Sequence, residues 1–244
     1  MNAEDITADL LEALAQFSTP TISNAIEVFD VRPRNKGFMG PAIRCLTPLS
    51  KPMVGFACTG KFRAAQPPSD DSQAPRGEYW EWLMAQPKPR VIVLQDLDDP
   101  PAVGSFWGEV QTTIHQALGC VGTITDGGVR DIPEVSRLGF AFFASAPIVS
   151  HAYVHLVEFG EPVEVGGLTV ATGDLLHGDE HGVIRIPREV APWLPEAARA
   201  YEEVEQAFIG QVREAGFTLE KLNRAHQAFG QARAALKPPS TEVT

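Results

Sequence analysis

The stretch GCVGTITDGGVRDIPEV, residues 119–135, begins like a buried strand and ends in charged residues. Its apolar run stops at Asp126 and two glycines, and the opposite charges of Arg130 and Asp131 follow side by side. Two interpretations are open: a strand that ends in a tight turn and a capped helix, or a strand that carries charged groups to a binding site. Spacing alone favours the first, because short motifs are often matched by chance.

The segments next to this stretch have lengths that bring their charged ends together. Residues 108–118 have the apolar spacing of a helix, and residues 121–125 return to a strand pattern. A helix of roughly ten residues covers about 15 Å and a strand of roughly five covers about 17 Å, so the chain returns to the start of the helix. We therefore expect Glu109 to lie within reach of Arg130 and Asp131 at one edge of a sheet.

Two carboxylates and a guanidinium in one place suit a particular chemistry. Carboxylate oxygens and water bind Mg²⁺ or Mn²⁺, and a planar guanidinium binds a keto-acid carboxylate or a developing oxyanion. Backbone amides at the start of the 108–118 helix, at Gly108, Val110 and Gln111, offer a further site for a substrate carboxylate. Such a set would stabilise an enolate, the intermediate of aldol cleavage and of β-keto acid decarboxylation.

The composition excludes several classes of protein. A formal net charge of −11 argues against a nucleic-acid partner, because phosphate binding requires clustered lysine and arginine. The three cysteines are far apart and form no C-x-x-C pair, which argues against a disulfide framework or a thiolate zinc site. We find neither a signal-peptide pattern at the N-terminus nor a long apolar run, so we expect a cytoplasmic protein with no membrane partner.

Strand and helix patterns alternate along the chain, which predicts an α/β domain with helical additions at both ends. The predicted organisation is one domain over residues 1–190, a C-terminal helical extension over 191–236 and a flexible tail over 237–244. The expected helices are 4–16, 21–29, 78–86, 108–118, 132–139 and two between 189 and 235, and Ser18 is the expected N-cap of the second, with Pro20 near its first turn. The expected strands are 53–64, 90–98, 121–125, 140–146 and several short segments over 154–187.

Four segments resemble the RraA family in order and spacing. This family contains the divalent-metal 4-hydroxy-4-methyl-2-oxoglutarate/4-carboxy-4-hydroxy-2-oxoadipate aldolases and the regulator of ribonuclease E activity. The resemblance covers about residues 18–190, and its acid-x20-Arg-Asp-x2-acid signature matches here as Glu109, Arg130, Asp131 and Glu134. The segments that carry it are WGE (107–109), GCVGTITDGGVRD (119–131), GFAFFAS (139–145) and VGGLTVATGDLLHGDEHGVIRIP (165–187).

The resemblance implies an αββα sandwich assembled as a homotrimer or homohexamer, with the site at a subunit interface. It implies that Asp131 ligates the metal, that Glu109 holds a metal-bound water, and that Arg130 contacts the substrate and its enolate oxygen. The implied activity is that of a metal-dependent lyase on a 2-keto acid such as 4-hydroxy-4-methyl-2-oxoglutarate, through a metal-stabilised pyruvate enolate, with oxaloacetate decarboxylation as a related activity.

The sequence also departs from the family pattern. Asn24 stands where the family commonly carries an aspartate, and HGDEHG (177–182) stands where it commonly reads acid-acid-Gly. These differences leave the substrate open. The family takes an acid from the C-terminal region of a neighbouring subunit, and Glu202, Glu203 and Glu205 are equal candidates for it.

Four histidines are a separate question. His151 and His155 are four residues apart on a segment that resembles a strand, and His177 and His181 flank two acids in a turn. They form either a second metal site or an acid/base pair, or they are surface and packing residues, which the spacing favours. We expect His177 and His181 to tune substrate choice rather than to bind the main metal.

Three functional alternatives follow. The first is the metal-dependent lyase, and the second is a non-catalytic regulatory protein that binds a partner through its oligomeric surface. The third is a lyase or hydratase that acts on another organic acid and uses the histidines as acid and base. Complete retention of the acid-Arg-Asp signature favours an enzyme.

Overall fold

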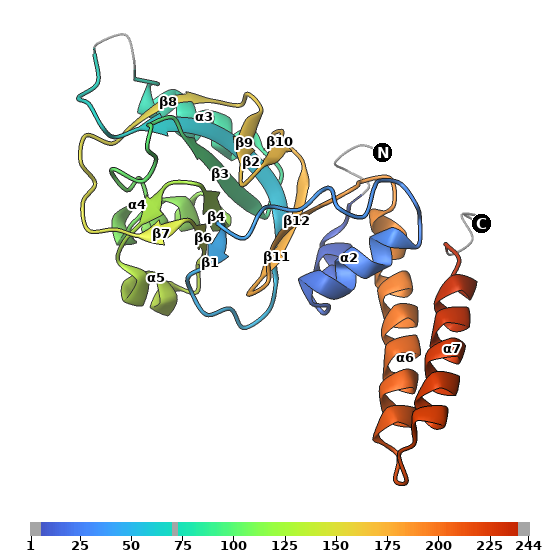
Figure 1. Ribbon diagram of the computed structural model, residues 1–244. Coiled ribbons are helices and arrows are strands. Elements are labelled where there is room, and N and C mark those ends of the chain that lie inside the picture. Colours follow the sequence, from blue (N-terminus) through green and yellow to red (C-terminus); the bar gives the residue numbers. More distant parts are fainter. Residues whose placement is uncertain (1–5, 70–72, 239–244) are drawn as a thin grey trace.

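A mixed β-sheet forms the centre of the protein (Figure 1). The computed structural model describes residues 6–69 and 73–238. The sheet has the order β1-β6-β4-β3-β2-β11-β12, and β8 pairs with the second half of β2. Its strands are β1 (Arg44–Cys45), β2 (Met53–Arg63), β3 (Arg90–Asp96), β4 (Cys120–Thr125), β6 (Ala141–Ala144), β8 (His155–Phe159), β11 (Leu175–Asp179) and β12 (Gly182–Ile186).

The central strands are parallel and buried on both faces. β2, β3, β4 and β6 run parallel, and β3 carries the nearly continuous apolar sequence RVIVLQD that a fully covered strand requires. Their carboxyl ends therefore meet at one edge of the sheet, and that edge carries Asp96 and the turn after Thr125.

Each face of the sheet has its own cover. Helices α3 (Arg76–Ala85), α4 (Glu109–Ala117) and α5 (Ile132–Leu138) pack on one face, where Leu83, Trp107 and Val135 belong to one core cluster. The hairpin of β9 (Val163–Val165) and β10 (Leu168–Val170) covers the other face through Val163, Val165 and Val170.

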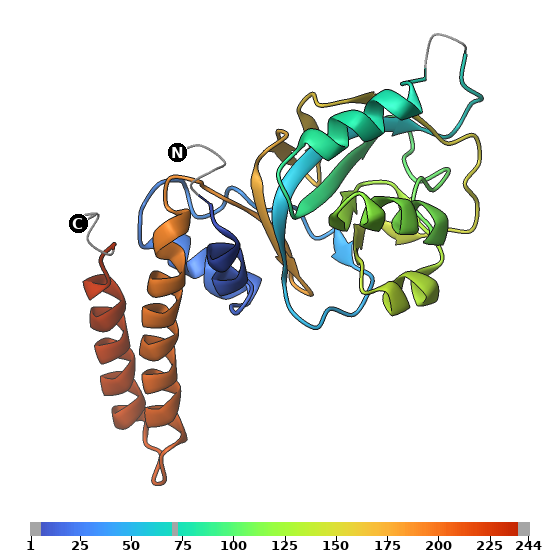
Figure 2. The same cartoon turned by 180° about the vertical axis from the view of Figure 1, so that it is seen from behind.

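Helices from both ends of the chain pack together beside β11 and β12. α1 (Ala8–Leu14) and α2 (Thr19–Glu27) contact α6 (Leu194–Arg213), and one apolar cluster joins them to the sheet. The Ser18 side chain accepts a hydrogen bond from the Thr21 amide and caps α2, as its sequence predicts. α6 and α7 (Leu219–Ala235) form a hairpin that projects away from the sheet (Figure 2).

The predicted fold class is confirmed: the chain forms a single α/β domain with helical additions at both ends. The predicted tail lies outside the described residues, apart from residues 237 and 238. One local expectation was wrong, because His151 does not share a strand face with His155. Ala152 has a φ of 44°, which places residues 151–153 in a turn before β8, so His151 is exposed and His155 is buried. Within the described ranges, no helix has both the length and the apolar character needed to cross a membrane.

His177 links the N-terminal helices to the sheet. Its Nδ1 lies 2.9 Å from Thr19 Oγ1 and its Nε2 lies 3.2 Å from the Leu14 carbonyl oxygen. Because a carbonyl only accepts, Nε2 donates and Nδ1 accepts from the threonine hydroxyl, which is the neutral form of the ring. Burial accordingly lowers the pKa of His177 to about 4.

We predict that His177→Leu destabilises the protein and reduces the dependence of its stability on pH. The substitution takes the ring nitrogen away from the buried Thr19 hydroxyl, at a cost of about 1–3 kcal/mol, whereas the Leu14 carbonyl still accepts from the Phe17 amide at 3.2 Å. In the wild type, the depressed pKa gives stability that is present above pH 6.5 and is lost as the pH falls toward about 4. Denaturant unfolding between these pH values measures both effects. An unchanged pH slope in the variant would contradict this account of the histidine.

Candidate active site

The end of the 119–135 stretch lies between two other segments of the chain. After the turn at Asp126 and Gly127, β5 (Gly128–Val129) pairs in parallel with β7 (Ala146–Pro147). On the other side, Val129 forms a parallel bridge with Trp107, and the Arg130 amide donates to the Trp107 carbonyl at 3.1 Å. These two pairings bring Arg130 and Asp131 against the start of α4.

The three expected residues meet at this point. The Glu109 backbone amide donates a hydrogen bond of 3.0 Å to Asp131 Oδ2, and Arg130 Nε lies 3.7 Å from the same oxygen. Asp131 has a φ of 57°, a left-handed conformation that aspartate adopts more readily than most residues. It occupies the cap position of α5 but makes no side-chain hydrogen bond to that helix. The carboxylate turns instead to the first amide of α4.

Gly108 is required by this arrangement for steric reasons. Its φ of −162° is ordinary extended backbone, so the requirement does not come from the backbone. A Cβ at this position would lie 2.5 Å from Asp131 Oδ2 and 3.2 Å from Arg130 Nε. The absence of a side chain at Gly108 therefore lets the carboxylate and the guanidinium approach the helix.

The start of α4 also offers free donors. Helical hydrogen bonding begins with the Thr112 amide, which donates to the Gly108 carbonyl at 3.0 Å. Among the described residues, no acceptor binds the amides of Val110 or Gln111, which come next after the amide that Asp131 occupies. Unpaired amides in the first turn of a helix attract a carboxylate or another anion. That Gly108, Val110 and Gln111 bind a substrate carboxylate stays a prediction, for which the amides of Val110 and Gln111 are open.

Glu134 takes no part in this contact. It lies in the first turn of α5 and forms a surface ion pair of 3.2 Å with Arg137. The side chains of Arg130 and Asp131 are each 36% exposed, so the site is open to solvent and to ligands.

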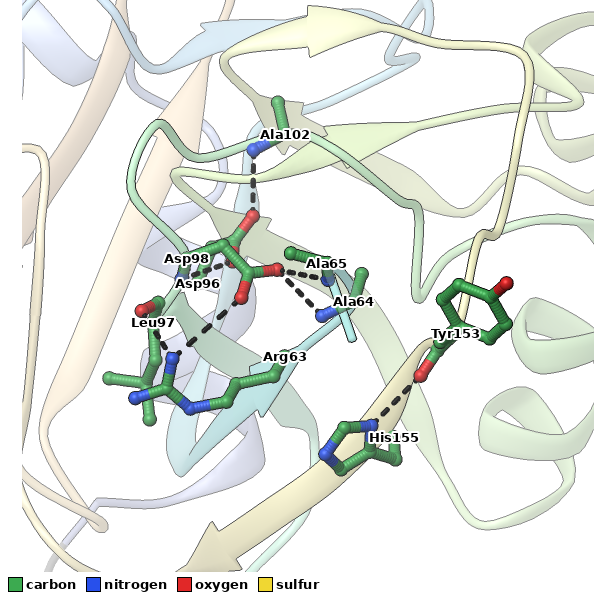
Figure 3. A network of polar contacts seen from close by, with 9 residues as sticks. All are labelled: Arg63, Ala64, Ala65, Asp96, Leu97, Asp98, Ala102, Tyr153 and His155. Atoms are coloured by element: carbon green, nitrogen blue, oxygen red, sulfur yellow. Dashed lines mark hydrogen bonds and ion pairs between the residues drawn. The ribbon is translucent and has the colours of Figure 1, made fainter. Parts of the chain in front are cut away.

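Sequence reasoning missed a group of acids that hold the same edge of the sheet. Figure 3 shows Asp96 at the end of β3, Asp98 in the loop after it, and Arg63 at the end of β2. Asp96 accepts from the amides of Asp98 and Ala102, at 3.0 and 2.8 Å. Asp98 accepts from the amides of residues 64 and 65, at 2.6 and 2.8 Å, and lies 3.8 Å from Arg63 Nη1. The acidic sequence DLDD at the end of the predicted 90–98 strand was the signal for this group.

Asp126 connects these acids to the 119–135 stretch. Its Oδ1 accepts from the Asp96 amide at 2.8 Å, and the two strands β3 and β4 are thereby joined at their carboxyl ends. Burial raises the pKa of Asp126 to about 6, and the nearby charge of Asp96 acts in the same direction. Burial also raises the pKa of Asp96.

The structure places the HGDEHG turn elsewhere in the chain. His177 pairs in register with Val54, near the amino end of β2, whereas Arg130 and Asp131 follow the carboxyl end of β4. Within one chain, His177 and His181 therefore lie at the opposite edge of the sheet from Arg130 and Asp131.

Asp179, Glu180 and His181 are the described residues whose ligand atoms gather within 4.8 Å of one another. Their hydrogen bonds explain this arrangement without a metal. Asp179 Oδ2 accepts from the Thr19 amide at 2.8 Å, and Oδ1 accepts from the His181 amide at 2.9 Å. Burial acts to raise the pKa of Asp179, but the hydrogen bonds from Thr19 and His181 outweigh it and lower the pKa. The carboxylate therefore acts as a cap for α2.

Two further histidines are packing residues. His115 is fully buried, its Nε2 lies 2.9 Å from the Tyr79 hydroxyl, and burial lowers its pKa to about 4. His155 lies beside Arg63 in the register of β8 and β2, and its Nδ1 lies 2.8 Å from the Tyr153 carbonyl oxygen (Figure 3).

Comparison with known proteins assigns the chain to a family. A model of the family described as "RraA-like: Aldolase/RraA" matches residues 7–185. The chain belongs to the RraA-like family. The matched residues include α4, the 119–135 stretch and the contact between Glu109 and Asp131.

Curated relatives of this RraA-like protein are distant. One, from Halalkalibacterium halodurans, is named "Putative 4-hydroxy-4-methyl-2-oxoglutarate aldolase"; it is 28% identical over 130 residues, which cover 53% of this chain and 59% of that one. Another, the uncharacterized protein MJ0644 of Methanocaldococcus jannaschii, is 29% identical over 121 residues, which cover 49% of this chain and 58% of that one. The chain thus spans less than two thirds of the length of these relatives.

Among solved structures, RraAS2 of Streptomyces coelicolor, described as an unusual member of the RNase ES inhibitor RraA protein family, has a TM-score of 0.64. It is 23% identical, with 82% of this chain and 95% of that one covered. An uncharacterized protein of Pseudomonas syringae pv. tomato has a TM-score of 0.70 at 24% identity, with 91% and 94% covered. At these identities the likeness establishes the fold alone.

We predict that Gly108→Ala displaces the Asp131 carboxylate and leaves the fold intact. The added methyl group meets a side-chain oxygen that is partly exposed and is able to move. Mn²⁺ titration followed by water proton relaxation measures the effect, and the affinity should fall. Gly230→Ala on α7 is the matched control, because a Cβ there meets nothing within 4 Å. Equal Mn²⁺ affinities in both variants would show that Gly108 does not shape the site.

We predict a pH-dependent difference between the wild type and Asp126→Asn. Asparagine keeps an oxygen that accepts from the Asp96 amide and removes the titration. Because the folded pKa of Asp126 is raised from 3.8 to about 6, its stabilising contribution is present in acid and is lost as the pH rises through this interval. The unfolding free energy of the wild type minus that of the variant should therefore decrease across this interval and stay constant above it. A difference that grows with pH would contradict the burial of Asp126.

Proposed function

We propose that this RraA-like protein is a divalent-metal-dependent lyase that cleaves a short 2-keto acid with a carboxylate at each end. The proposal rests chiefly on one observation. The Asp131 carboxylate is held at the first amide of α4, beside Arg130 and next to two free amides. The name of the Halalkalibacterium halodurans relative supports the choice of 4-hydroxy-4-methyl-2-oxoglutarate as the first substrate to test.

The residues present fit a divalent cation. Asp131 Oδ2 is occupied by the Glu109 amide, while Oδ1 makes no hydrogen bond to a described residue and the side chain is 36% exposed. Mg²⁺ keeps several waters and binds proteins through one or two carboxylates, so a single aspartate with Glu109 nearby is a sufficient oxygen set for Mg²⁺ or Mn²⁺. Bound there, the cation would supply Lewis-acid stabilisation of the negative charge that develops on the keto oxygen.

The other groups hold the substrate. The amides of Val110 and Gln111 bind the carboxylate next to the keto group, at the positive end of α4. The Arg130 guanidinium faces the keto oxygen, and its interaction strengthens as that oxygen becomes negative. Glu109 is exposed at the start of α4 and holds a water that takes the proton of the substrate hydroxyl. The bond between C3 and C4 then breaks, its electron pair moves toward the keto oxygen, and a proton delivered to C3 completes one pyruvate.

We infer that a second subunit completes the site. The partial exposure of Arg130 and Asp131 leaves room for a side chain from a homotrimer or homohexamer neighbour. Among the three C-terminal acids, Glu202 accepts from Thr21 Oγ1 at 3.2 Å within its own chain. Glu203 and Glu205 form no such bond to any residue over 6–69 or 73–238, so they are the better candidates for a carboxylate that reaches a neighbour.

A non-catalytic role would use the same fold without chemistry at Arg130. The likeness to RraAS2 of Streptomyces coelicolor bears on the fold and does not favour either function. An assay of pyruvate release from the hydroxy-keto diacid distinguishes the lyase from the non-catalytic role. The lyase releases pyruvate only with Mg²⁺ or Mn²⁺, and EDTA abolishes the release. Full activity in EDTA would contradict the metal, and no activity toward any 2-keto acid would contradict the lyase.

We predict that Arg130→Ala lowers kcat by about 10²–10³, the usual effect of removing one donor that acts on developing charge. Arg130→Lys should recover only part of this loss, because an ammonium group cannot make the forked contact. The measurement is steady-state pyruvate release at saturating Mg²⁺.

Arg137→Ala is the matched control, since Arg137 is an exposed arginine on α5 whose partner is Glu134. Asp131→Ala should lose bound metal as well as rate, whereas Arg130→Ala should keep the metal. If Arg130→Ala instead unfolds the protein or retains full activity, the pair serves only to close the turn.

A further inference from the structure

A cavity lies away from the Arg130 site, between α2 and the helical hairpin of α6 and α7. It has a volume of about 420 Å³, which falls within the range of small-molecule sites. Its polar lining consists of Asn24, Glu27, Arg34, Tyr201 and Arg233, from α2, the loop after it, α6 and α7. Neither the proposed reaction nor the family comparison gives this cavity a role.

Tyr201 is the most enclosed of the polar residues that line this cavity. Its side chain is 5% exposed, it lines the cavity, and its hydroxyl forms no hydrogen bond to any residue that the structure describes. The hydroxyl itself is open to solvent, so its hydrogen bond goes to water or to a ligand. Burial raises the pKa of Tyr201, although Arg233 opposes this, and the phenol therefore remains a donor at neutral pH.

Two arginines bring positive charge to the same cavity. The Arg233 guanidinium lies over the rings of Tyr201 and Phe229, with its carbon 5.4 and 5.6 Å from the ring centroids. No carboxylate within the described ranges forms an ion pair with Arg233. Arg34 uses its Nε to contact Glu27 at 3.3 Å, which leaves its terminal nitrogens available.

We propose that this cavity binds a small anion that carries a carboxylate or phosphate group. The Arg233 guanidinium lies over the two rings, and its planar fork suits a paired contact with two oxygens of one anion. Tyr201 donates to the same group from α6, and Asn24 and Arg34 contact it from α2 and the loop after α2. The charges that line the cavity sum to a single positive charge, since Glu27 balances one of the two arginines, whereas the whole chain is strongly acidic.

Calorimetric titration of the full chain with inorganic phosphate and, separately, with succinate tests the proposal at constant ionic strength. We expect saturable binding of at least one of the two anions, and the preferred one identifies the group recognised. Arg233→Gln should weaken this binding at least about tenfold, the loss of one charge-assisted contact, and Tyr201→Phe should weaken it to a lesser degree. Arg224→Gln, which removes an exposed arginine on the same helix, should not change it.

Two results would overturn the proposal: no saturable binding of either anion, or binding that Arg233→Gln and Tyr201→Phe leave unchanged. Circular dichroism of each variant checks that α7 remains folded. Because Arg130 lies at the other end of the domain, Arg130→Ala should bind the anion as the wild type does, so this test is independent of the proposed lyase activity.

Discussion

The hydrogen bond from the Glu109 amide to the Asp131 carboxylate is the interaction on which the candidate site depends. It joins the first turn of α4 to the residue that begins α5, although the two residues are 22 positions apart. One oxygen of Asp131 thereby accepts from the helix and lies 3.7 Å from Arg130 Nε, and the other is left for a ligand. The bond also requires glycine at position 108, so sterics and electrostatics act on the same few atoms.

The parallel sheet makes this contact possible. Parallel strands end at a common edge, and here Asp126 joins the ends of β3 and β4 while Asp96 and Asp98 bind the amides of the surrounding loops. Burial opposes the ionisation of Asp96 and Asp126, which raises their pKa values. Carboxylates that are held in this way form a rigid base for the charged turn, and we attribute the placement of Arg130 to this base. Catalytic groups often stand on such loops at the end of a rigid sheet.

Much of this arrangement follows from the sequence. Helices and strands have regular rises per residue, so the lengths of the 108–118 helix and the 121–125 strand could be compared. They predicted that the chain returns to the start of the helix and brings Arg130 and Asp131 close to Glu109. The N-cap at Ser18 was likewise readable, since a hydroxyl before a helix has a local partner. The acids at the end of β3 were visible as DLDD, but their partners are the backbone amides of residues 64, 65 and 102. A backbone amide is present at almost every residue, so the sequence does not indicate which amides a carboxylate will bind.

The histidines show where sequence reasoning stops. The sequence pattern gave no means to tell that the ring of His177 is enclosed by α1 and α2, because Leu14 and Thr19 are about 160 positions away. The turn that separates His151 from His155 depends on the positive φ of an alanine, which local preferences do not anticipate. The cavity beside Tyr201 arises from the packing of the C-terminal hairpin on α2, which is a tertiary property.

The most direct test of the account is the position of a bound cation. Crystals grown with Mn²⁺ and diffracted near the manganese absorption edge give an anomalous map that places the metal without reference to any assumed mechanism. The account predicts a peak at bonding distance from the free oxygen of Asp131, with the remaining positions filled by water. A peak at Asp179 and His181, with none at Asp131, would contradict it.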